Sequence, residues 1–239
     1  MQMITITGKQ ALHGRIRPAA AKNSTLPLLA ATLLCRGPCR LQEVPALADV
    51  TTSLALLQAV GADVRRCGAD LCTRPVQALC GEIPESLAGA MRSSVFYLAP
   101  LLCRVGEVRL PLPGGCKLGP RPVDIHLAGL AAMGAQVELE GIAVTLRRRG
   151  PLHGVDFALR LPSVGATMTL MMAATQAGGT TILRGAACEP EICDLANFLR
   201  ACGAHITGAG TPVVVIQGGK PLQGTAWTPL PDRIAAATY

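Results

Sequence analysis

The 239-residue chain has very few aromatic side chains: one Trp, two Tyr and three Phe. Proteins that bind single-stranded nucleic acid stack bases on aromatic side chains along a positive groove, so this class is disfavoured. Charged residues are also scarce, at 15%, whereas half of the chain is apolar. A chain of this length can bury a sizeable core, which must be built from Ala, Leu, Val and Ile.

Two targeting features are also missing from the sequence. No apolar run reaches the ~18 uncharged residues of a membrane span. The first ten residues, MQMITITGKQ, lack the charged start and apolar run of a signal peptide. We therefore expect a cytoplasmic protein without a membrane partner.

The ten cysteines include no CxxC pair, and most lie in apolar segments. We expect reduced thiols that act mainly as small core residues, and no metal site. Basic residues exceed acidic ones by 22 to 15, which favours anionic partners. Since the only basic run is Arg147-Arg148-Arg149, small phosphorylated metabolites fit better than nucleic acid.

Three segments of the chain share one pattern: LALLQAVGADV, LAGLAAMGAQV and LANFLRACGAHI. Each predicts a helix that ends at a left-handed glycine and leads into a strand. The three glycines recur about every 70 residues, at Gly61, Gly134 and Gly203. An acidic residue that could cap the helix or sit in its first turn precedes each pattern, at Asp49, Asp124 and Asp194.

Each of these helices follows another apolar helix and a short strand, and a further strand comes after it. Three such units fill residues 22–219, which predicts an α/β fold with the helices packed together and the sheets outside. The first helices begin at Lys22-Asn23-Ser24, Arg92-Ser93-Ser94 and Ser163-Val164-Gly165. Helix N-termini attract phosphate, so three that point the same way would form one anion-binding face.

The segment from Leu112 to His126 places a cysteine in a loop rich in Gly and Pro. Cys116 precedes Lys117 and lies near Arg121, and neighbouring cations lower the pKa of a thiol below about 8.5. Cys116 is therefore the candidate reactive thiol. The alternative is a small residue in a turn.

The runs AAKNSTLPLLAA, MRSSVFYLAPLL, LPGGCKLGPRPVDIH, PSVGAT, EPEICDLANFL and LPDRI occur in this order. Together they resemble the UDP-N-acetylglucosamine 1-carboxyvinyltransferases of the enolpyruvyl transferase family, over the whole chain. The resemblance implies an inside-out α/β barrel lobe built from three helix-strand repeats. It also implies enolpyruvyl transfer from phosphoenolpyruvate to the 3-hydroxyl of UDP-N-acetylglucosamine in peptidoglycan synthesis, by addition and elimination without a cofactor. The PGGC loop disfavours the related enzyme that acts on shikimate 3-phosphate.

The resemblance assigns roles to particular residues. Cys116 would be catalytic, as a general acid toward the methylene carbon of phosphoenolpyruvate and as the site of a covalent adduct. Phosphoenolpyruvate would bind to Lys22, Arg92 and Arg121. The UDP-sugar would bind to Asn23, Pro122, Val123, Asp124, His126, Ser163, Val164 and Gly165. The sequence departs from the family where a usual lysine is replaced by Leu161 and a usual glutamate by Ala235.

The family has two lobes, and the resemblance places this chain in one of them. Residues 1–21 would form an N-terminal strand and linker of the missing lobe, residues 22–220 the three-repeat Cys-loop lobe, and residues 221–239 the start of the crossover back. Activity would then require the missing second lobe, which carries the base. A competing hypothesis is a catalytically silent fragment or a UDP-sugar binding module.

Two groups of residues leave alternatives open. His126 is either a ligand-facing residue or a helix-start residue. The acidic cluster of Glu189, Glu191 and Asp194 suggests either metal or acid-base chemistry, or a solvated loop with a helix cap. We favour the solvated loop.

Overall fold

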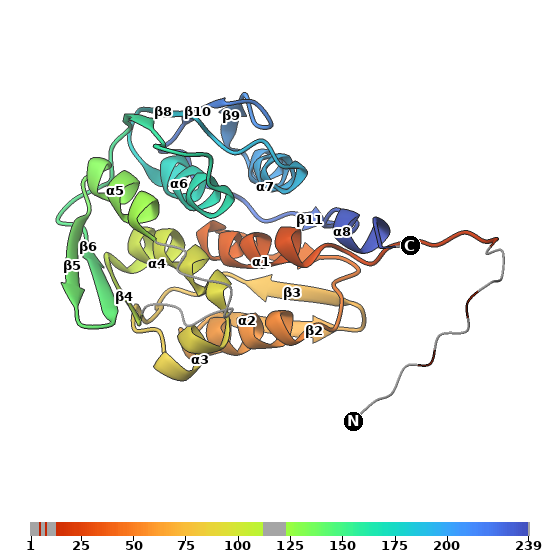
Figure 1. Ribbon diagram of the computed structural model, residues 1–239. Helices are drawn as coiled ribbons and strands as arrows, with labels where there is room; N and C mark the ends of the chain where they lie inside the picture. The colour runs from red at the N-terminus through yellow and green to blue at the C-terminus, as the bar shows by residue number, and fades with distance from the viewer. Residues whose placement is uncertain (1–4, 6–7, 9–12, 112–122, 239) are drawn as a thin grey trace.

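The structure is a computed structural model that describes residues 5, 8, 13–111 and 123–238. Within these residues, no helix is long and apolar enough to cross a membrane. The described chain forms three units with the same order of elements, as the sequence predicts (Figure 1). The N-terminal strand expected within residues 1–21 falls largely outside the described residues.

The bounds of the elements are as follows. The first unit consists of α1 (Lys22–Ala31), η1 (Thr32–Leu34), β1 (Cys39–Leu41), α2 (Ala48–Ala59), β2 (Asp63–Cys67) and β3 (Asp70–Arg74). The second consists of η2 (Arg92–Tyr97), α4 (Leu98–Val105), β4 (Glu107–Pro111), α5 (Asp124–Ala132), β5 (Gln136–Glu140) and β6 (Ala143–Arg147). The third consists of α6 (Val164–Gln176), β8 (Thr180–Arg184), α7 (Pro190–Ala201), β9 (His205–Thr207) and β10 (Val213–Gln217). The connections add α3 (Glu85–Ala90), β7 (Asp156–Ala158), β11 (Ala226–Trp227) and α8 (Arg233–Ala236).

The three sheets share one strand order, in which the third strand of a unit lies between the first and the second. These are β1-β3-β2, β4-β6-β5 and β8-β10-β9, and all pairs within them are antiparallel. The connecting strand β7 pairs in parallel with β8, and β11 pairs in parallel with β1. Because β11 follows the third unit and pairs with the first, the three units close into a ring.

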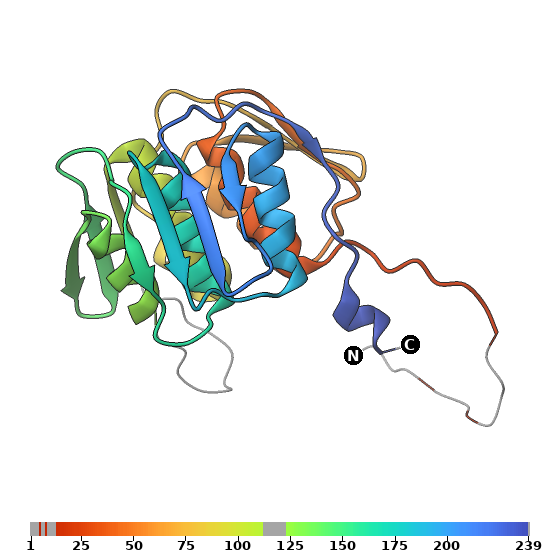
Figure 2. The same ribbon diagram turned by 90° about the horizontal axis from the view of Figure 1, so that it is seen from above.

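The first helices of the units lie at the centre and the sheets lie outside (Figures 1 and 2). Figure 2 shows the sheet β8-β10-β9 lying across α6. Every residue of α6 from Ala166 to Thr175 is buried, as is every residue of α1 from Ser24 to Ala31. A helix that is apolar on all sides is stable only when it is surrounded, which explains the predicted inside-out arrangement.

Glycines determine how the units turn and meet. Gly61, Gly134 and Gly203 have φ of 88°, 102° and 105°, so the predicted left-handed helix ends are confirmed. A second set, which the sequence analysis did not identify, follows a Leu-x-Gly pattern at Gly81, Gly154 and Gly224. A Cβ there would lie 2.1, 2.2 and 1.9 Å from the backbone oxygens of Glu107, Thr180 and Pro38. These glycines let each connection pass directly against the next unit.

The structure adds detail to one expectation about local structure and contradicts another. The first helix of the second unit begins as the 3₁₀ helix η2 and becomes α-helical only from Leu98. The cysteines are not mostly core residues: only Cys35, Cys39 and Cys202 of the nine in the described residues are buried. Cys67, Cys80 and Cys188 are exposed because they lie at strand ends and in connections rather than on the inner faces of helices.

Candidate active site

A cleft of about 980 Å³ lies at the end of the molecule where the helices begin. Each unit contributes residues from the starts of both of its helices. They include Lys22 and Asp49 from the first unit, Arg92 and Asp124 from the second, and Gly165 and Glu191 from the third. The expected convergence of helix N-termini on one face is therefore confirmed.

The cleft brings together most of the predicted site residues. It is lined by Lys22, Asn23, Arg92, Val123, Asp124, His126, Ser163, Val164 and Gly165. The predicted catalytic Cys116, together with Arg121 and Pro122, lies outside the described residues. Leu161 also lines the cleft and is 44% exposed.

The start of α6 has a side-chain cap, provided by the residue just before the helix. The Ser163 hydroxyl oxygen accepts a hydrogen bond from the Ala166 backbone N–H at 3.3 Å. The first N–H groups of any α-helix lack partners within the helix, so the start of α6 leaves donors for an anion. A Cβ on Gly165 would lie 2.8 Å from Nε2 of His126, so a side chain there would crowd the imidazole.

His126 is 6% exposed, and neither ring nitrogen has a well-oriented hydrogen bond among the described residues. Burial lowers the pKa of His126 from 6.5 to about 4. The Val123 backbone and the Asp124 carboxylate oppose this shift, whereas the Arg92 cation adds to it. The imidazole is therefore neutral near pH 7, with one nitrogen that can donate and one that can accept.

Three ion pairs surround the cleft, one for each second helix. Lys22 Nζ lies 2.9 Å from Asp49, an Arg160 nitrogen 2.7 Å from Asp124, and Arg233 Nε 3.0 Å from Glu191. Hydrogen bonds from Arg160 lower the pKa of Asp124 below its usual value. Arg160 is not among the residues predicted from the sequence. The available signal was its place shortly before the start of α6, where a cation is unfavourable unless it faces an anion.

The expectation of a solvated acidic loop at Glu189, Glu191 and Asp194 is wrong for two of its members. Helix α7 begins at Pro190, so Asp194 lies in its second turn and cannot be a cap or a first-turn charge. Glu191 and Asp194 are only 4% and 3% exposed. Asp194 lies on the apolar stripe, four residues before the buried Phe198, and this spacing was the available signal.

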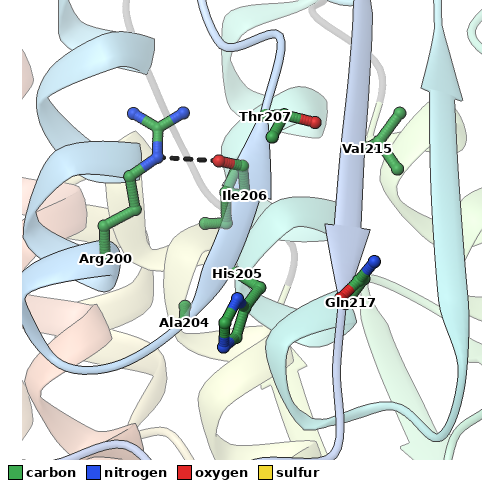
Figure 3. A pocket seen from close by; sticks show the side chains of 7 residues that line it. All are labelled: Arg200, Ala204, His205, Ile206, Thr207, Val215 and Gln217. Carbon is green, nitrogen blue, oxygen red and sulfur yellow. Dashed lines mark hydrogen bonds between the residues drawn. The ribbon is translucent and has the colours of Figure 1, made fainter.

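No group of three or more potential metal ligands occurs among the residues that the structure describes. A second cavity of about 340 Å³ lies along the edge strand β9 (Figure 3). There, Arg200 Nε donates to the Ile206 backbone oxygen at 2.8 Å. This cavity contains none of the predicted site residues.

The sequence profile of the EPSP synthase (3-phosphoshikimate 1-carboxyvinyltransferase) family matches residues 6–239, so the chain belongs to this family of enolpyruvyl transferases. Within it, the chain is 45% identical to the UDP-N-acetylglucosamine 1-carboxyvinyltransferase of Synechocystis sp., with 99% of the chain and 55% of that protein covered. The enzyme of the same name from Escherichia coli O1:K1 / APEC is 44% identical, with 100% and 57% covered. The chain thus spans about half the length of these relatives, and the predicted resemblance is confirmed.

Solved structures agree on the fold. The enolpyruvyl transferase NikO from Streptomyces tendae has a TM-score of 0.83 at 24% identity, with 97% of this chain and 55% of that chain covered. The EPSP synthase from Acinetobacter baumannii has a TM-score of 0.77 at 19% identity, with 96% and 52% covered. These matches confirm the predicted enolpyruvyl-transferase lobe.

Proposed function

We propose that this chain acts in the transfer of the enolpyruvyl group from phosphoenolpyruvate to the 3-hydroxyl of UDP-N-acetylglucosamine, a step of peptidoglycan synthesis. The observation that carries the proposal is the 980 Å³ cleft on which helix N-termini and cationic side chains converge. Both substrates carry phosphate, which helix N-termini attract. The names of the relatives support the choice of these substrates.

We assign different parts of the two substrates to different residues of the cleft. We assign the diphosphate to the start of α6, at Ser163, Val164 and Gly165, because unpaired helix N–H groups suit phosphate oxygens. Asn23 is assigned to the sugar nucleotide, and Pro122, Val123, Asp124 and His126 are assigned to its uridine. Phosphoenolpyruvate is assigned to Lys22, Arg92 and Arg121, because Lys and Arg hold carboxylate and phosphate groups through charge-assisted hydrogen bonds.

The proposed chemistry proceeds by addition and then elimination, with no metal or organic cofactor. In the addition, Cys116 donates a proton to the methylene carbon while the sugar hydroxyl oxygen bonds to the neighbouring carbon and loses its proton to a base. In the elimination, that methyl carbon gives up a proton and phosphate leaves with its bonding electrons. Proton donors and acceptors work best with a pKa near the working pH.

We further propose that the base lies outside this chain. Residues 1–21 and 221–239 would connect the lobe of residues 22–220 to a second lobe, and the chain's coverage of about half of its relatives supports this division. The same observation favours one alternative, a UDP-sugar binding module without turnover.

Two measurements test the proposal. Calorimetric titration of the chain with UDP-N-acetylglucosamine should show binding. Release of phosphate from phosphoenolpyruvate should require both this chain and a separately expressed second lobe from a relative. A folded chain that does not bind the UDP-sugar contradicts the proposal. Binding without turnover in the presence of the second lobe supports the binding-module alternative.

A third measurement addresses Cys116. Brief treatment with a small anionic epoxide, followed by peptide mass spectrometry, should label Cys116 first because cations flank it in the sequence. The matched comparison is the exposed Cys188, which has Ala187 and Glu189 as its sequence neighbours rather than a cation. Burial raises the pKa of Cys103 to about 12, so that thiol should stay unlabelled. Equal labelling of Cys116 and Cys188 would remove the argument for a special thiol.

A further inference from the structure

We propose that Asp194 is a positioning residue of the cleft: acting through Ser24, it fixes the first turn of α1, which presents Lys22 and Asn23. Asp194 and Ser24 do not themselves line the cleft. The role of Lys22 and Asn23 as ligand contacts rests on the proposed function. The hydrogen bonds of Asp194 are observed in the structure and are independent of the proposed function.

In the first turn of α1 the N–H and the hydroxyl of Thr25 donate to the Ala21 oxygen, but other usual supports are missing. Its N-cap is Ala21, which has no side chain that can accept a hydrogen bond, and the turn contains no acidic residue. Pro27 lies inside the helix and has no N–H, so the Asn23 carbonyl loses the partner it would have in a regular helix. A turn that lacks these bonds needs contacts from other parts of the chain.

Asp194 provides such contacts from the neighbouring helix α7. Asp194 is 3% exposed, and its carboxylate accepts hydrogen bonds from three donors in two segments of the chain. The donors are the Ser24 hydroxyl, Trp227 Nε1 at 3.0 Å and the Leu230 backbone N–H at 3.2 Å. The Ala21 N–H in turn donates to the oxygen of Leu230 at 2.7 Å, so Lys22 lies between one residue bonded to Asp194 and one bonded to the connection that Asp194 also binds.

The position of Ser24 determines where the neighbouring cleft side chains lie. Ser24 is adjacent to Asn23, and Lys22 lies one residue further toward the helix start. Within a helix these residues move as one unit, so a shift of Ser24 displaces both cleft side chains. A misplacement of about 1 Å in a positioning group can cost on the order of 100-fold in an enzyme's rate. The carboxylate that holds Ser24 therefore affects ligand binding without touching the ligand.

Trp227 is a built-in reporter of this contact. It is the only tryptophan of the chain, its indole N–H donates to Asp194, and its ring packs edge-on against Phe198 at a centroid distance of 6.3 Å. All intrinsic tryptophan fluorescence therefore comes from the residue that is hydrogen-bonded to Asp194. Loss of the acceptor at Asp194 should change the emission maximum.

The test compares two variants that each remove one buried hydroxyl from the α1 region. Ser24→Ala removes the hydroxyl that donates to Asp194. Thr32→Val removes the hydroxyl just after the other end of α1, which donates to the Leu29 oxygen at 2.7 Å. We expect Ser24→Ala to weaken binding of UDP-N-acetylglucosamine on the order of tenfold and Thr32→Val to leave it within about twofold. Asp194→Asn replaces one of the two acceptor oxygens with a donor and removes the charge, so it should weaken binding at least as much and also shift the Trp227 emission.

Amide hydrogen exchange separates positioning from general stability. We expect faster exchange in the first turn of α1 for Ser24→Ala than for Thr32→Val, because only the first variant releases that turn. Equal affinities and equal exchange in the two variants would overturn the proposal, whatever their unfolding midpoints. If the unsubstituted chain binds no UDP-sugar, the proposed function fails. The exchange comparison then decides the positioning role by itself.

Discussion

The starts of α1 and α6 reach the same cleft from equivalent places in two repeats, yet they are held in different ways. Helix α6 carries its own cap, Ser163. Helix α1 has no side-chain cap, and Ser24 in its first turn donates to Asp194, which lies 170 residues further along the chain. The repeated pattern therefore specifies where a helix begins. The hydrogen bonds that hold the first turn differ from one unit to the next.

Among the variants that test this difference between α1 and α6, we expect Asp194→Ala to lower the free energy of unfolding most. The change removes the acceptor of three donors, a buried one on Ser24 and part-buried ones on Trp227 and Leu230. A buried donor without a partner costs about 1–3 kcal/mol and a part-buried one costs less, so we expect a loss of about 3 kcal/mol in the free energy of unfolding. Urea denaturation measures it. A loss no greater than that of Ser163→Ala would show that the two helix starts are supported equally.

A second effect concerns His126, which packs against the start of α6. Its pKa in the folded protein is about 4, below the usual 6.5, so the unfolded chain takes up the proton first as the pH falls. Stability from this residue is therefore complete above pH 6.5 and decreases toward pH 4, by about 3 kcal/mol in total.

Denaturation of the His126→Leu variant across this pH range provides the control. We expect a weaker pH dependence than in the unsubstituted chain, because the leucine cannot titrate. Identical pH dependence in the two proteins would mean that the folded protein accommodates the charged imidazole, and that the start of α6 is more open to water than its burial indicates.

The sequence predicted those parts of the fold whose causes are local. Apolar periodicity and a glycine with positive φ are written into each unit, so the helix ends at Gly61, Gly134 and Gly203 could be placed. The strands β7 and β11 could not, because segments of three and two residues become strands only through pairing with β8 and β1. Their existence depends on tertiary contacts that no local pattern encodes.

The same division applies to the site. The helix starts that line the cleft follow from local composition, and Lys22, Asn23 and Ser163 to Gly165 were predicted there. Asp194 was interpreted as a solvated charge, because carboxylates are rarely buried. Its burial depends on donors from Ser24 and Trp227, which only the folded ring brings together. The pairing of Arg160 with Asp124 likewise joins residues from two units.

A smaller effect is expected from Ser163→Ala. This change removes the hydroxyl that accepts from the Ala166 N–H, and the loss of an N-cap side chain costs about 1 kcal/mol. Urea denaturation measures the change, and the matched variant is Ser163→Asn, which retains a capping oxygen. Equal loss in both variants would mean that packing, rather than capping, holds the start of α6.

The smallest effect on stability is expected from Arg160→Ala, although this residue stands beside the start of α6. Its ion pair with Asp124 is half exposed on both sides, and exposed pairs contribute little to folding, so the unfolding midpoint should not change measurably.

Binding should respond differently, because removal of a cation from the cleft weakens the attraction for a diphosphate at low salt. We expect a several-fold weaker affinity for UDP-N-acetylglucosamine at low ionic strength, with the difference shrinking as salt is added. Titrations at two salt concentrations measure this, with Arg184→Ala as the control, because Arg184 forms a similarly exposed pair with Asp156 outside the cleft. Equal affinities for the two variants at low salt would show that the start of α6 attracts its ligand through the helix N-terminus alone.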